Sequence, residues 1–142
     1  MFGFIVALAL VGPLLFMLSF WRTASNWIHT EARGIYVEAS KTLIATSSIA
    51  IAILVSFLGK TTLPHWMLQR AVSSLTICMV SSVFAILAIA RAYAHAKSRL
   101  DAGDKSGQLT RLEMVCVFTP EYLALSAFLV GFLYLARLTY QI

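Results

Sequence analysis

Glu121 is an acidic residue within an otherwise apolar stretch, 114–136, that is long enough to cross a bilayer. A charge inside a bilayer is costly, so a carboxylate there indicates a functional site by default. The sequence Thr119-Pro120-Glu121 also fits the first turn of a helix, with an N-cap, a proline at the first position and an acid near the positive dipole end. Glu121 is therefore either a buried functional carboxylate or a residue at the membrane surface.

Hydroxyl side chains recur along two further apolar stretches, 43–59 and 71–90. When these stretches are folded as a hairpin with Lys60 level with Gln69, hydroxyls from both helices come to the same depth. The side chains that this register brings together are Thr46, Ser47, Ser48, Ser81 and Ser82. Small residues let membrane helices pack closely, so the stripe predicts either helix packing or a hydroxyl-lined water path in an oligomer. It holds no acid or base, which argues against a proton relay.

The other residue types that support chemistry are scattered. His29, His65 and His95 do not share one depth in the hairpin, as bis-histidine haem ligation requires, and a zinc site needs more ligands. The sequence has no glycine-rich phosphate loop and no nucleophile elbow. We therefore expect a protein that is not an enzyme and holds no cofactor or metal. Cys78 and Cys116 are expected as small buried hydrophobic side chains.

The composition places the chain in a membrane. Of its 142 residues, 60% are hydrophobic and 12% are charged, about half the charge of a soluble domain, and the mean hydropathy is +0.84. These values exclude a disordered chain, a DNA-binding domain and an ordinary cytosolic enzyme. The net charge of +5 comes from thinly spread cations, which is typical of cytoplasmic loops beside anionic lipid. The expected partners are the lipid bilayer and other membrane protein subunits or copies of the chain itself, and not nucleic acid.

Four stretches are apolar enough to cross a bilayer, which takes about 20 residues of helix. They are 1–21, 43–59, 71–90 and 114–136. The first could also be read as a signal peptide, but it has neither a positive segment at its start nor a small-residue cleavage site. The sequence therefore predicts an all-α fold: residues 1–142 form a single integral membrane bundle of four transmembrane helices.

The distribution of positive charge predicts the orientation. Eight Lys and Arg residues lie in the two long connections, whereas Lys60, Arg70 and Arg137 lie on the other side. Cytoplasmic loops carry the excess of Lys and Arg in membrane proteins. We therefore expect both long connections in the cytoplasm, the N- and C-termini outside, and a location in a cell inner or plasma membrane.

Helical patterns continue beyond the bilayer ahead of 43–59 and after 71–90. Apolar residues recur on one helix face between Ile28 and Leu43, and the stretch 90–99 is rich in alanine. In the same hairpin register, Glu38 lies opposite Arg91 and Glu31 lies close to Arg99. The sequence thus predicts that these two helices extend into the cytoplasm as an antiparallel stalk. Its charges either form register-setting ion pairs or face water.

Two functions of different classes fit these features. The first is a non-catalytic accessory or scaffolding subunit of a larger membrane complex, for which the charged stalk and the loop 101–108 would provide a docking surface. The alternative is a homo-oligomeric ion channel or small-solute transporter, in which the Ser/Thr stripe lines a path and Glu121 sets the ion preference.

Overall fold

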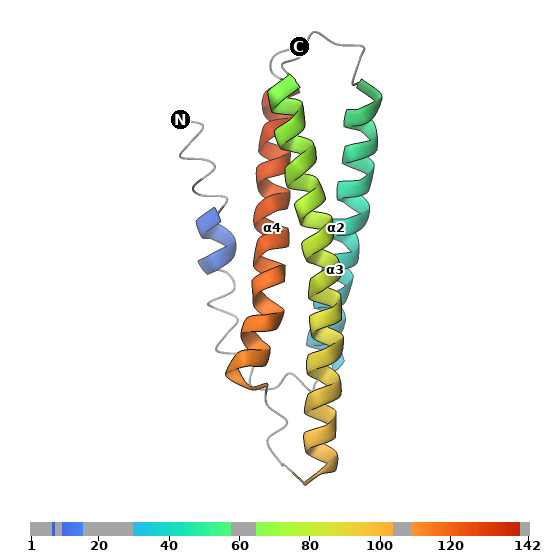
Figure 1. The fold of residues 1–142 in the computed structure, drawn as a ribbon, viewed down its shortest axis with the longest axis vertical. Helices are drawn as coiled ribbons and strands as arrows, with labels where there is room; N and C mark the ends of the chain where they lie inside the picture. Colours follow the sequence, from blue (N-terminus) through green and yellow to red (C-terminus); the bar gives the residue numbers. More distant parts are fainter. Residues whose placement is uncertain (1–6, 8–9, 16–29, 58–64, 104–108, 140–142) are drawn as a thin grey trace.

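The structure, a computed structural model, describes residues 7, 10–15, 30–57, 65–103 and 109–139 (Figure 1). It is all-α. Its three long helices are α2 (Thr30–Phe57), α3 (His65–Asp101) and α4 (Arg111–Thr139). Each of them is long and apolar enough to cross a membrane. The chain is therefore a polytopic helical membrane protein, as its composition predicts.

The expected first span, 1–21, lies mostly outside the described residues. Its described part, 10–15, is helical and lies beside α4 (Figure 1), where the Tyr122 hydroxyl donates a hydrogen bond to the Leu10 carbonyl at 3.0 Å. The other three spans are confirmed as helices that run beyond the predicted limits at both ends, except that α2 is described only as far as Phe57.

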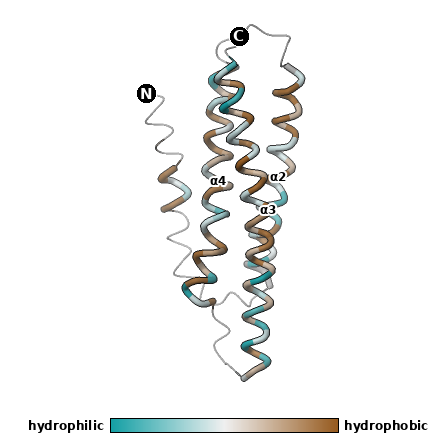
Figure 2. Tube along the Cα trace, in the orientation of Figure 1, coloured by the Kyte–Doolittle hydropathy of each residue, from teal (hydrophilic) through white to brown (hydrophobic). Residues whose placement is uncertain are grey.

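α3 is the longest and most central helix. Its 37 residues measure about 55 Å at 1.5 Å per residue, against a hydrocarbon core of about 30 Å. One end projects past α4, and Figure 2 shows that this end is mostly hydrophilic. It stops close to Gly103, whose φ of 94° suits a glycine after a helix end. The predicted extension of this helix is confirmed, and α2 is also helical ahead of its predicted span, from Thr30.

A seam of small and apolar side chains along α3 holds the bundle together. Its members are alternately four and three residues apart, the 3.5-residue repeat of left-handed helix pairs. The buried residues that form this seam are Ala71, Leu75, Cys78, Ser82, Ala85, Ile89, Ala92 and Ala96. α4 packs against α3 more extensively than α2 does, and α2 and α4 touch each other least. α3 is therefore the common partner of both neighbours.

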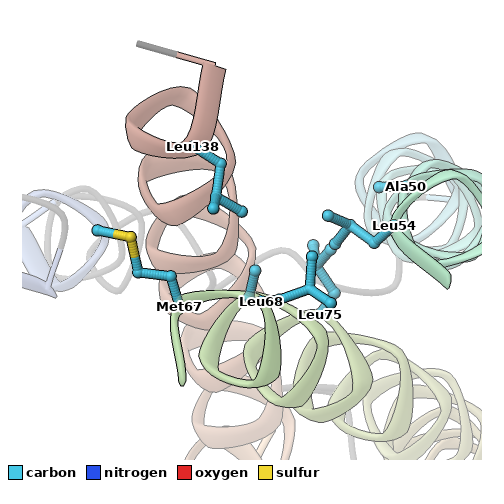
Figure 3. Close-up of a cluster of buried hydrophobic side chains, with 7 residues drawn as sticks. Ala50, Leu54, Met67, Leu68, Leu75 and Leu138 are labelled. Carbon is cyan, nitrogen blue, oxygen red and sulfur yellow. The ribbon is translucent and has the colours of Figure 1, made fainter. Parts of the chain in front are cut away.

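Two apolar clusters lie toward opposite ends of the bundle. In one of them, side chains from all three helices meet, and Figure 3 shows Leu54 of α2 beside Leu75 of α3 and Leu138 of α4 pointing toward α3. The other cluster includes Ile89 of α3 and Phe118 of α4. The helix segments between the two clusters carry the buried polar residues.

The start of α4 excludes one of the two interpretations of Glu121. α4 runs without interruption from Arg111 through Pro120, so Thr119-Pro120 is not a helix start. A reciprocal capping box determines the true start: the Thr110 N–H donates to Glu113 Oε2 at 2.8 Å, and the Glu113 N–H donates to Thr110 Oγ1 at 3.3 Å. Glu121 consequently lies ten residues into the helix, about 15 Å from its first residue.

Candidate functional site

Between the two apolar clusters, the three helices contribute polar side chains that are almost fully buried. We call this set the buried polar layer. Its described members are Ser40, Ser47, Ser81, Ser82, Glu121 and Ser126. Four of them, Ser47, Ser81, Ser82 and Glu121, were predicted from the sequence as candidate site residues. Ser40 and Ser126 were missed, because a lone serine in a sequence carries no signal of its depth.

Glu121 is bound inside this layer. It is 5% exposed, and Oε1 accepts a hydrogen bond of 2.5 Å from the Ser40 hydroxyl, which is fully buried. The two residues are 81 positions apart and join α2 to α4, the pair of helices with the least other contact. The carboxylate therefore holds together helices that otherwise meet mainly through α3.

The hydroxyls of the predicted stripe have two different environments. Ser47 donates to Cys78 Sγ at 3.3 Å, and Ser82 lies beside the same thiol. Thr46 and Ser48 instead donate to carbonyl oxygens one turn earlier in α2, each at 2.7 Å. Ser47 and Ser82 thus contact a side chain of the α2–α3 interface, whereas the Thr46 and Ser48 hydroxyls are bonded to their own helix, with Ser48 also close to α3.

The register of the α2–α3 pair differs from the predicted one by about one helical turn. Ser47 was expected opposite Ser82 but bonds to Cys78, four residues earlier. Ser48 approaches Met79 Sδ at 3.6 Å in the same register, and the Arg33 guanidinium lies 4.0 Å from the centre of the Tyr93 ring. A shift of one turn presents nearly the same helix face, so the hydroxyls still meet.

The predicted ion pair between Glu38 and Arg91 does not form. Glu38 is exposed and instead accepts a hydrogen bond of 2.7 Å from Lys41 in its own helix. The register shift is the reason, because it leaves Glu38 one turn short of Arg91. The side chain of Glu31 lies outside the described residues. Its expected neighbour Arg99 donates to both carboxylate oxygens of Glu113 in α4, at 3.2 and 2.9 Å.

Glu113 is a residue that sequence reasoning missed. It caps α4, binds Arg99 with two hydrogen bonds, and lies 3.7 Å from His95 Nδ1. The signal was available, since Thr110-Arg111-Leu112-Glu113 has the spacing of a capping box. Glu113 therefore ties the start of α4 to the projecting end of α3.

We expect Glu113→Ala to lower the free energy of unfolding by about 1–2 kcal/mol, because it removes the cap and the partly buried partner of Arg99. Glu38→Ala, which removes an exposed pair, is the matched control and should change it by less than about 0.5 kcal/mol. Denaturant unfolding in detergent, followed by circular dichroism, measures both. Equal effects of the two substitutions would contradict this role of Glu113.

Grooves open on the surface of the described residues toward both ends of the bundle. The first, of about 570 Å³, lies between α3 and α4 and includes Cys116, which is exposed and not buried as predicted. The second, of about 600 Å³, lies near the other end of the bundle, where Arg70 contacts the Trp66 ring and the Tyr134 hydroxyl. Neither of these grooves is lined by Glu121 or by Ser47.

The chain matches no protein-family model, no curated protein and no solved structure. Its function is therefore inferred from its own geometry. Within the described ranges, no three His, Cys, Asp or Glu side chains lie close enough together to hold a metal ion.

Proposed function

We propose that this chain is a non-catalytic accessory or scaffolding subunit of a larger membrane complex. The observation that carries the proposal is a second, exposed seam on α2. Its residues are alternately three and four positions apart, the spacing used by the buried seam of α3. They are Thr42, Ala45, Ile49, Ala52 and Ser56, all on the face of α2 opposite Ser40, Ser47 and Leu54.

The side chains of this exposed α2 seam are better suited to packing against another helix than to contact with lipid alone. Small side chains allow two helix backbones to approach closely inside a membrane, where van der Waals contact drives association. The Thr42 and Ser56 hydroxyls are bonded to carbonyl oxygens of their own helix, at 2.8 and 2.7 Å. The seam can therefore pack against an apolar helix without leaving a hydroxyl unbonded.

The burial of Glu121 supports the same proposal. A carboxylate that selects ions must meet them along a water path, whereas Glu121 is 5% exposed and bonded to Ser40 within one chain. We therefore assign this acid to helix packing rather than to conduction. In the proposed orientation the projecting end of α3 lies in the cytoplasm, since the long connections carry most of the positive charge.

Native mass spectrometry of the tagged protein, taken from its own membrane in mild detergent, tests the proposal. We expect foreign chains in fixed stoichiometry with the 15.6 kDa subunit. Replacing both Ala45 and Ala52 with leucine should release the foreign chains, because the larger side chains hold the partner helix away from α2. Ile49→Leu conserves volume on the same seam and is the matched control.

A complex of this chain alone, at an integer multiple of its mass, would overturn the accessory role. Ion flux through liposomes that contain only this protein would then support the homo-oligomeric channel. Foreign chains that stay bound to the Ala45→Leu/Ala52→Leu variant would show that the partner uses a different surface.

A further inference from the structure

The groove between α3 and α4 has the length and the openness to hold part of a lipid. Its α3 wall runs from Phe84 to His95, about 16 Å along the helix, and the facing wall runs from Thr110, which caps α4, to Cys116 in α4. Phe84, Leu87 and Leu112 border it, and each exposes more than half of its surface. An apolar groove open at the side of a membrane helix pair is accessible to acyl chains.

The α3 wall of this groove changes in polarity along its length. Phe84 and Leu87 lie toward the middle of α3, whereas Arg91 and His95 lie one to two turns nearer its projecting end. An apolar region followed by a cationic region along the membrane normal has the same order as the acyl chain and phosphate of a phospholipid. The order matches a lipid whose headgroup lies at the surface crossed by the projecting end of α3.

Two arginines lie at or beside the polar end of the groove, and its acid is paired with one of them. Glu113 is the acid that lines it, and Arg99 already binds both oxygens of that carboxylate. Arg91 is exposed and forms no ion pair with an acid among the described residues. Its guanidinium is therefore available to an anion, and the planar donor set of arginine matches the oxygens of a phosphate group.

We propose that this groove binds one anionic phospholipid, with the phosphate group at Arg91 and an acyl chain along Phe84 and Leu87. The proposal does not rest on the accessory role, since the groove lies on α3 and α4 and the exposed α2 seam lies on another helix. Electrostatic attraction selects anionic over zwitterionic headgroups, because a zwitterionic lipid carries no net charge for Arg91 to balance.

Cys116 provides a reporter within the groove of the unmodified protein. It is exposed and lines the groove, whereas Cys78, the other cysteine, is buried. The test is maleimide labelling of the purified full chain in detergent, with phosphatidylglycerol or phosphatidylcholine added at equal concentration. We expect phosphatidylglycerol to slow the labelling of Cys116 and phosphatidylcholine to have a much weaker effect. Equal protection by the two lipids, or none, would overturn the proposal.

Arg91→Gln tests the position of the headgroup. It should raise the concentration of phosphatidylglycerol that gives half-maximal protection about fivefold, the effect of removing one cation near an anionic lipid. Lys97→Gln removes an exposed cation from the same helix outside the groove and should leave this concentration within about twofold of the original. Equal shifts in the two variants would show attraction to the whole surface rather than a site. No shift with Arg91→Gln would equally overturn the assignment.

Discussion

Replacing Ser40 with alanine should lower the free energy of unfolding by about 1–3 kcal/mol, because it leaves the buried Glu121 carboxylate without its donor. Glu121→Met should also destabilise the fold, since the Ser40 hydroxyl then loses its acceptor in the core. The double variant should recover most of the loss, because removing both polar partners removes the unsatisfied group. This result would identify Glu121 as a link between α2 and α4.

A double-mutant cycle, measured by denaturant unfolding in mixed micelles, gives the coupling energy directly. Ser126→Ala is the control, because the Ser126 hydroxyl is buried and has no hydrogen-bond partner among the described residues. Its removal should be neutral or stabilising. Strictly additive effects of Ser40→Ala and Glu121→Met would show that their hydrogen bond contributes nothing to stability.

Gly131→Val should destabilise the α3–α4 pair by about 1–3 kcal/mol, the usual penalty for overpacking a core. A Cβ atom on Gly131 would lie 2.9 Å from both Cγ and Cδ2 of Leu75. Leu75 is fully buried in the α3 seam, so its side chain must shift within a close-packed core to admit the new atoms. The close approach of the two helices therefore requires glycine at this position.

Gly34→Val is the matched control for this experiment, since a Cβ at Gly34 in α2 meets no atom within 4 Å. This substitution should change the free energy of unfolding by less than about 0.5 kcal/mol relative to the unmodified protein. Leu75→Ala should partly rescue Gly131→Val by opening space for the new side chain. The melting temperature in detergent compares all the variants. Equal melting temperatures of the Gly131→Val and Gly34→Val variants would contradict the close α3–α4 contact at Gly131.

Much of the architecture followed from local patterns. Long apolar stretches with few charges can bury their backbone polar groups in a bilayer only as helices, so the three described helices were predictable. The alanine-rich continuation of α3 was predictable for the same local reason, the intrinsic preference of alanine for helix. The expected four-span count also includes 1–21, which lies mostly outside the described residues.

The candidate site was predictable only in part. Ser47, Ser82 and Glu121 do lie in one buried layer, as their types and depth in the sequence suggested. The identity of their partners was not predictable, and Glu121 is bonded to Ser40, which no pattern singled out. Ion pairing was a poor guide to register, because an exposed pair contributes only about 0–1 kcal/mol.

Local sequence is enough to predict that this chain is helical, that it belongs in a membrane and where its helices run, because these properties depend on local apolar content and helix propensity. Long-range packing sets the register of the helices, which close contact along the α3 seam defines within one turn. It also decided that Arg99 binds Glu113 and that Arg91 borders an open groove. A helical repeat presents a similar face after each turn, so periodicity defines the face of a helix and not its partner residue.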